Sequence, residues 1–384
     1  MKLRGITIDN GGSEVRVLPY GKNIEDGLIK VNNMFAKVKP ENFRYKETVD
    51  PFSVIEILKA PHEQMLGIIV NGMTVEQYPS ERLVISNQSN KTASNEYYMQ
   101  FIFAVAQDAI QNKCEGGLDY VITTCIPVKE HSGIKDCSGL LKHNISGSYM
   151  IRFPLLPKDN NTVSFRINKE NIFVVPEGAI ATVALGNMLN ENVNTLVIDV
   201  GHVTADLSLF KGKDMYGSIA RSSNFAGMTI IALLKSALQA EGINVGDAEC
   251  SEALMTGYVK KGINSVDVSR IVKDVKKVYV NNYLKKEISE LLSLAGLTLS
   301  QIQYIVPVGA IMTANERVGS MIDEIINIVG FKDSEVMYVS ANLRYVNIEM
   351  ASKVTAKVMR KLESKNIGES GHGNTSEDRR RFQA

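Results

Sequence analysis

Two stretches of the chain repeat one strand–turn–strand pattern with an aspartate and a glycine at the turn. GITIDNGGSEVRVL (residues 5–18) and LVIDVGHVTADLSL (residues 196–209) align when Asp9 is matched to Asp199, and Gly11 then falls on Gly201 without a gap. The apolar, β-branched residues that flank each turn predict two β-hairpins. Two related hairpins 190 positions apart indicate a duplicated domain, and we expect a cleft between the two halves.

The rest of the chain alternates strand-like and helix-like segments. Its 384 residues are too many for one ordinary core, so two domains are expected. Apolar residues at helical spacing predict helices at 95–113, 226–241, 265–295 and 343–362. Strands are predicted at 120–128, at the start of 172–189, at the start of 302–314 and at 335–340. Pro176 is expected near the start of the helix in 172–189. This alternation indicates an α/β class with mixed sheets.

The two turns have the chemistry of a phosphate site. Backbone N–H groups of such turns point toward an anion, and glycine lets phosphate oxygens approach closely. Two turns that face each other across a cleft can hold one anion between them. The residues that supply the turns are Gly11, Gly12 and Ser13 on one side, and Gly201, His202 and Val203 on the other.

Carboxylates beside a phosphate need a cation between them. Mg²⁺ keeps several waters and takes few protein ligands, so Asp9 and Asp199 are suited to ordering a hydrated Mg²⁺. Thr204 can add a hydroxyl, and Arg16 can offset phosphate charge. The alternative is that both aspartates only stabilise their hairpin turns. The repeat, and the spacing D-x-G-x-x-T-x-D in the second copy, favour phosphate binding.

Composition limits the partners of the chain. The net charge of +1 gives no overall field that would attract nucleic acid or a membrane. The N-terminal residues enter a strand pattern without the apolar core of a signal peptide, and no apolar run is long enough to span a bilayer. We therefore expect a cytoplasmic protein. Reduced structural thiols, rather than a zinc site, are expected for the four cysteines, which form no C-x-x-C pair: Cys114, Cys125, Cys137 and Cys250.

Three further segments have simple interpretations. Residues 260–286 carry eight lysines and arginines, for which a solvated helix face is favoured over direct DNA binding. The polar, Gly- and Ser-rich residues 364–384 predict a disordered tail. The aromatic side chains of 97–103 are expected to pack in a core helix.

Five motifs, which occur along the chain in the order expected for the family, resemble the actin-like ATPases, which share their duplicated, ribonuclease H-like fold with Hsp70 chaperones and sugar kinases. IDNGGSEVR resembles the first phosphate loop, and DVGHVTAD the second. VPEGAIA (175–181) and ANLRYVNIEMA (341–351) resemble the two segments that connect the domains, and VPVGAIM (306–312) resembles the adenosine loop. The resemblance covers residues 1 to about 360.

Within this family the chain looks most similar to the bacterial plasmid-segregation actins of the ParM and Alp group. SSNFAGMTIIALL (222–234) resembles the stretch that follows the second phosphate hairpin in ParM-like proteins. The resemblance implies two domains around a nucleotide cleft. Domain I would comprise residues 1–174 and 340–363, and domain II residues 175–339, with 364–384 as the tail.

The resemblance also implies site residues. Glu177 would orient the attacking water, with Asp199 and Asp206 completing the catalytic set; a carboxylate at a helix start can also serve only as a helix-dipole partner. Asp9 and Asp199 would hold Mg²⁺ through water. The residues implied to bind the nucleotide are Asp9, Asn10, Gly11, Gly12, Ser13, Arg16, Gly201, His202, Val203, Thr204, Gly227, Gly309, Ala310 and Ile311. Among these, Gly227 and Gly309 would let the backbone approach ribose and purine.

Four residues depart from the family pattern: His202 and Val203 replace small residues, Ala310 replaces a glycine, and Glu349 stands where a small residue is common. His202 can bond a phosphate oxygen or cap its turn, and the second is favoured.

The implied activity is hydrolysis of ATP, or GTP, with Mg²⁺, coupled to assembly of filaments that segregate plasmid DNA. The implied partners are further copies of the chain and a DNA-binding adaptor of the ParR type. The alternatives are a small-molecule kinase of the sugar-kinase type and a non-polymerising actin-like scaffold.

Overall fold

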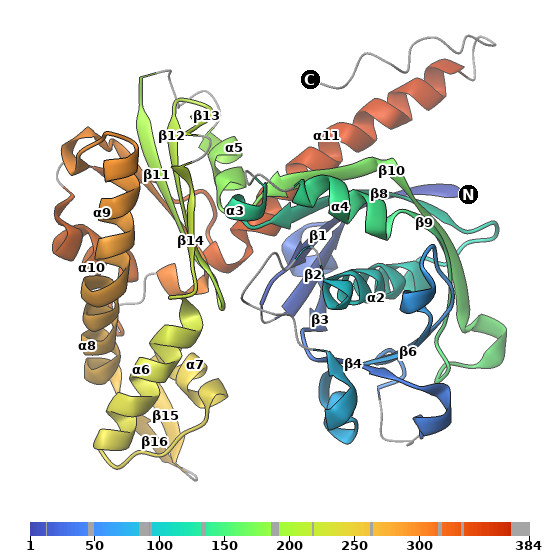
Figure 1. Cartoon of the computed structure of the whole chain (residues 1–384), viewed down its shortest axis with the longest axis horizontal. Helices are drawn as coiled ribbons and strands as arrows, with labels where there is room; N and C mark the ends of the chain where they lie inside the picture. The colour runs from blue at the N-terminus through green and yellow to red at the C-terminus, as the bar shows by residue number, and fades with distance from the viewer. Residues whose placement is uncertain are drawn as a thin grey trace.

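The computed structural model describes residues 1–12, 14–44, 50–83, 92, 94–131, 136–185, 192–216, 219–261, 264–313, 317–331 and 334–369. These residues form two bodies, each built on its own sheet (Figure 1). One body contains the strands β1 to β10 together with the C-terminal helix, and the other contains β11 to β18. No described helix combines the length and apolar character that a membrane crossing requires.

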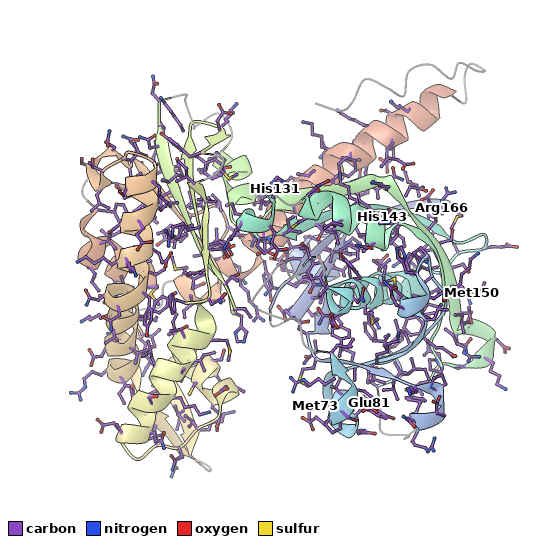
Figure 2. All side chains as sticks on the ribbon, viewed as in Figure 1. Met73, Glu81, His131, His143, Met150 and Arg166 are labelled. Carbon is purple, nitrogen blue, oxygen red and sulfur yellow. The ribbon has the colours of Figure 1, made fainter. Side chains whose placement is uncertain are left out.

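The first body is built on a ten-stranded sheet in the order β3-β2-β1-β8-β10-β9-β5-β6-β4-β7. β1, β8 and β10 run parallel, and the other neighbours pair antiparallel. The strands are β1 (Lys2–Asn10), β2 (Glu14–Pro19), β3 (Ile29–Asn32), β4 (Phe35–Val38), β5 (Val54–Lys59), β6 (Gly67–Asn71), β7 (Arg82–Leu83), β8 (Leu118–Ile126), β9 (Gly147–Arg152) and β10 (Thr162–Pro176). In Figure 2, Met150 and Arg166 lie on the outer side of this body, and Met73 and Glu81 lie at its lower end.

Helices cover both faces of this sheet. The even-numbered positions of β1 place Ile6 and Ile8 in one core with the helix α2 (Asn95–Gln111). Thr7, which points to the opposite face, lies 2.7 Å from Thr355 of α11 (Val346–Glu369), as measured between their hydroxyl oxygens. As predicted, the aromatic residues of 97–103 are buried in the core. The other helices here are α1 (Ile24–Gly27), α3 (Val128–His131) and α4 (Cys137–Ile145).

The second body is built on a sheet in the order β13-β12-β11-β17-β18, with β14 paired to β12. Its strands are β11 (Asn194–Val200), β12 (Ala205–Lys211), β13 (Asp214–Met215), β14 (Arg221–Ser223), β17 (Tyr304–Val308) and β18 (Glu335–Val336). A separate hairpin pairs β15 (Tyr258–Lys261) with β16 (Asn264–Asp267). The helices are α5 (Thr182–Leu185), α6 (Gly227–Ala240), α7 (Asp247–Thr256), α8 (Ser269–Tyr279), α9 (Lys285–Leu294) and α10 (Met321–Ile325).

The predicted duplication is present in the strand order. β3-β2-β1-β8-β10 in the first sheet corresponds to β13-β12-β11-β17-β18 in the second. In both, the first two strands of the repeat pair antiparallel and the later strands add in parallel. The hairpin registers also match, because Asp9 lies opposite Arg16 and Asp199 lies opposite Asp206. Asp199 is 190 positions after Asp9, and Asp206 is 190 positions after Arg16.

Three predicted segments differ from the structure. The segment 265–295 begins with the strand β16, and its helix contains a π turn at Val280–Leu284 between α8 and α9. β18 has two residues rather than six, because only Glu335 and Val336 pair with β17. The last helix continues to Glu369, so the first residues of the predicted disordered tail are helical; residues 370–384 lie outside the described part of the chain.

Lys276 was predicted to lie on a solvated face, and this is wrong. It lies in α8 with 1% of its surface exposed, because that side of the helix packs toward α10. Its Nζ donates to Val318 O at 3.1 Å and to Gly319 O at 3.0 Å. Burial lowers the pKa of Lys276 to about 8.

We expect Lys276 to make the protein more stable as the pH rises from about 8 to 10.5. In this window the unfolded chain keeps the lysine proton whereas the folded chain has lost it, so raising the pH favours folding. Below this window the cost of the buried charge is fully present, at roughly 3 kcal/mol. Denaturant unfolding on either side of the window should show this rise in the unsubstituted protein and not in Lys276→Met. The control Lys277→Met changes an exposed neighbour and should keep the rise; equal pH profiles for the two variants would contradict the assignment.

Candidate functional site

One cavity of about 1610 Å³ lies between the two sheets. It is lined by both predicted turns and by both segments that were expected to connect the domains. The predicted site residues that line it are Asp9, Asn10, Gly11, Gly12, Arg16, Glu177, Asp199, Gly201, His202, Val203, Thr204, Asp206, Gly227, Gly309, Ala310 and Ile311. Ser13 lies outside the described residues. The structure therefore brings together residues that are far apart in the sequence.

An equivalent backbone hydrogen bond closes each of the two turns. The N–H of Gly11 donates to Glu14 O at 3.2 Å, and the N–H of Gly201 donates to Thr204 O at 2.9 Å. The turns also approach each other, since a Cβ placed on Gly12 would lie 2.5 Å from Val203 Cγ2. The tips of the two hairpins are thus adjacent across the cavity, which is the arrangement required for two turns to hold one anion.

Gly227 and Gly309 allow backbone segments to pack closely. A Cβ on Gly227 would lie 3.0 Å from Gly201 O, and the N–H groups of Gly227 and Met228 donate to Gly201 O and His202 O. Gly309 has φ +100°, and a Cβ there would lie 2.2 Å from Val200 O. Both glycines are therefore needed by the protein's own backbone. Their approach to a nucleotide remains a prediction.

Four buried carboxylates line the cavity: Asp9, Asp199, Asp206 and Glu177. Asp199 and Asp206 lie directly opposite each other on β11 and β12. Like charges in such a pair destabilise a sheet, so this position suits a bound cation. No group of three His, Cys, Asp or Glu side chains within the described ranges forms a ready metal site. A hydrated Mg²⁺ fits this arrangement, because it needs only one or two carboxylates.

Arg16 is held in place by both acidic and backbone groups. Its Nη1 lies 3.0 Å from Asp9 Oδ2 and donates to Arg344 O at 2.9 Å, and its Nε donates to Glu14 Oε1 at 2.7 Å. Burial alone would lower the pKa of Arg16, but the charges of Asp9 and Glu14 raise it above its ordinary value. Arg16 is thus a permanent cation beside Asp9, as well as a candidate partner for phosphate.

Tyr345 lines the cavity and contacts three cationic side chains, and no sequence pattern indicated that it belongs to the site. Arg16, Lys30 and Arg344 lie over its ring at 5.2, 5.1 and 5.7 Å from the ring centroid. Arg344 also pairs with Glu14 at 3.0 Å. A tyrosine in a predicted helix gives no sign of such a cluster, because only Arg344 is its neighbour in the sequence, whereas Arg16 comes from β2 and Lys30 from β3.

Glu177 does not start a helix as predicted. It follows Pro176, the last residue of β10, and its N–H donates to Ile126 O at 2.7 Å, which extends the pairing with β8. Gly178 then turns the chain with φ +65°, and a Cβ there would lie 3.1 Å from Asp199 Cβ. Glu177 therefore does not lie in the first turn of a helix, where it could act as a helix-dipole partner. It directly precedes Gly178, whose backbone packs closely against Asp199.

His202 contributes its backbone to the site. Its carbonyl accepts from the N–H of Met228 at 2.8 Å, which joins the second turn to α6. Burial lowers the pKa of the His202 side chain, so the imidazole is neutral at pH 7 and is a weak partner for phosphate. That the His202 side chain caps its turn stays a prediction.

The architecture of this chain is similar to that of known proteins. No family model and no curated protein matches the sequence. Many solved structures are similar to this chain, and three of them match over almost its whole length. The actin-like protein Alp7A has 12% identity and a TM-score of 0.73, covering 95% of this chain and 99% of its own. Bacillus thuringiensis ParM with AMPPNP has 11% identity, a TM-score of 0.63 and coverage of 94% and 100%. A 15-stranded ParM filament from Clostridium botulinum has 15% identity, a TM-score of 0.62 and coverage of 93% and 100%.

These identities are low, and the likeness is one of architecture. It agrees with the duplicated strand order and with the cavity between the two sheets. The chain has the two-domain actin-like fold, similar to those of Alp7A and ParM.

Proposed function

We propose that this protein is an actin-like nucleoside triphosphatase that assembles into filaments and segregates plasmid DNA. The observation that carries the proposal is the meeting of the two hairpin turns, with Asp9 and Asp199, in one cavity. Two similar solved structures support it, since one is a ParM with AMPPNP and another is a ParM filament. We also propose the domain boundaries 1–174 with 340–363, and 175–339.

In this proposal the two glycine turns bind the phosphates of ATP or GTP. Backbone N–H groups of the turns offer hydrogen bonds, and Arg16 supplies positive charge. Asp9 and Asp199 would hold a hydrated Mg²⁺ through its waters, and Thr204 would add a hydroxyl. Bound Mg²⁺ would neutralise charge on the phosphates.

Glu177 is the proposed acceptor for the proton of the attacking water. It is buried and lines the cavity close to Asp199, so its carboxylate can hold a water against a phosphate that lies between the turns. Asp206 lies opposite Asp199 and is proposed to orient water in the same network.

Filament assembly follows from the proposed switch. Nucleotide binding would favour one arrangement of the two bodies, and hydrolysis would favour another with weaker contacts between subunits. Head-to-tail contacts that do not close into a ring give helical filaments. Contact with DNA would pass through a separate adaptor of the ParR type.

High-speed sedimentation with and without Mg²⁺-ATP tests this proposal, with phosphate release followed in the same samples and Mg²⁺-GTP as a second arm. We expect pelleting that depends on nucleotide, together with phosphate release. Nucleotide binding without a pellet under any condition would contradict filament assembly. Turnover that required an added sugar or similar acceptor would favour the small-molecule kinase, and binding with neither pellet nor turnover would favour the non-polymerising scaffold.

A further inference from the structure

Asn347 joins three parts of the cavity through one side chain. It is the second residue of α11, and it lines the cavity. Its Nδ2 donates to Asp199 Oδ2 at 2.9 Å, and its Oδ1 accepts from the N–H of Gly178 at 2.9 Å. A single amide therefore links the second sheet, the segment that leaves β10, and the C-terminal helix.

The orientation of this amide is fixed by its partners. The backbone N–H of Gly178 can only donate, so it must face the carbonyl oxygen Oδ1. An ionised carboxylate can only accept, so Asp199 must face Nδ2. Asparagine satisfies both demands at once, whereas an ionised aspartate at this position satisfies only one of them and alanine satisfies neither.

The amide also lies where two proposed reactive groups meet. Gly178 directly follows Glu177, and a Cβ on Gly178 would lie 3.1 Å from Asp199 Cβ. The helix that carries Asn347 is anchored in the first body, since Thr355 lies 2.7 Å from Thr7 of β1. Asn347 thus ties Asp199, which lies on a strand of the second sheet, to a helix that is anchored in the first body.

We propose that Asn347 is a positioning residue that fixes the carboxylate of Asp199 relative to Glu177. This inference rests on the proposed triphosphatase function and deepens it. Without the Nδ2 donor, Asp199 keeps its place in the strand but its carboxylate loses the hydrogen bond that ties it to α11, and a bound hydrated Mg²⁺ would then be held less accurately relative to Glu177. Residues that orient metal-binding groups from behind commonly change metal affinity or activity by about 10-fold to 100-fold when they are replaced.

The sharpest variant is Asn347→Asp, which keeps the size and the acceptor for Gly178 but removes the donor to Asp199. We expect kcat for phosphate release to fall by about 10-fold to 100-fold, and the Mg²⁺ concentration for half-maximal rate to change by a similar factor. The KM for ATP should change much less. The control Asn342→Asp adds the same charge nearby while keeping the acceptor that receives the N–H of Arg344, and its Mg²⁺ midpoint should stay within about twofold of the original.

A second variant separates positioning from folding. In Asn347→Asp with Asp199→Asn, the donor and the acceptor exchange places, so the hydrogen bond can form again. We expect the melting temperature lost in Asn347→Asp to recover in the double variant, while phosphate release stays low because the carboxylate is on the wrong residue. Failure of the melting temperature to recover would contradict the hydrogen bond on which the inference rests.

The outcomes distinguish this inference from the proposed function. If the unsubstituted protein releases phosphate but Asn347→Asp keeps its kcat and Mg²⁺ midpoint, the positioning role is overturned and the triphosphatase function stands. Equal changes in Asn347→Asp and Asn342→Asp would also overturn it, because they would reflect charge alone. If the unsubstituted protein neither binds Mg²⁺-ATP nor releases phosphate, the proposed function fails, and the positioning role fails with it.

Discussion

Replacing Glu177 by glutamine is expected to slow phosphate release at least about 100-fold while nucleotide binding is kept. The amide has nearly the same size as the carboxylate, but it cannot accept the proton of the attacking water. Because Glu177 is held by its own backbone hydrogen bond to Ile126, the variant should fold normally. Pellets formed with Mg²⁺-ATP should therefore persist, since the step that weakens subunit contacts is blocked.

The matched control is Glu349→Gln. Glu349 is also partly buried, and its carboxylate accepts from Ser340 Oγ at 2.6 Å, but it is not among the residues that line the cavity. This variant should release phosphate at a rate close to that of the unsubstituted protein. A Glu177→Gln protein that turns over normally would assign the water-orienting role to another group, and Asp206 would be the next candidate.

Replacing Gly309 by alanine is expected to lower the stability of the second body by about 3–5 kcal/mol, an unusually large effect for one methyl group. Two costs add. The φ of +100° is unfavourable for any residue with a Cβ, and that Cβ would lie 2.2 Å from the carbonyl oxygen of Val200. Because this oxygen belongs to backbone, it can move only if β11 and the turn after β17 separate. We expect the melting temperature to fall by about 10 °C and nucleotide binding to weaken.

Gly330→Ala isolates the cost of the backbone conformation. Gly330 has φ +90°, but no heavy atom lies within 4 Å of the position of its Cβ. This control should lose only about 1–2 kcal/mol. If the two variants melt at the same temperature, the close approach of Gly309 to Val200 is not what makes glycine necessary there.

Local patterns were sufficient to predict the elements that carry the phosphate turns. Both hairpins alternate apolar residues around a short polar turn, and period-two alternation directly reports a strand with one buried face. The duplication was visible because Asp-x-Gly recurs in the same strand context. Every predicted site residue except Ser13, which lies outside the described part of the chain, lines the cavity.

Contacts between distant segments could not be predicted in the same way. Asn347 bonds Asp199 across 148 positions, and nothing in the residues around either one indicates the other. Lys276 occupies a helix with many charged residues, so its burial depends on the way α10 packs and not on local sequence. The pairing of β15 with β16 was missed because the predicted helix 265–295 took in most of β16.

The duplication has a consequence for the direction in which a ligand can enter the cavity. Two identical halves would form a site with twofold symmetry, and an elongated ligand could then bind in either of two opposite orientations. The symmetry is broken at one pair of equivalent positions, where the first half carries Arg16 opposite Asp9 and the second carries Asp206 opposite Asp199. One end of the cavity is thereby compensated in charge and the other is doubly acidic. A molecule with two unlike ends, such as a triphosphate joined to a nucleoside, would then bind in one orientation in preference to the other. The difference between Arg16 and Asp206 thus makes the two related turns unequal toward a ligand.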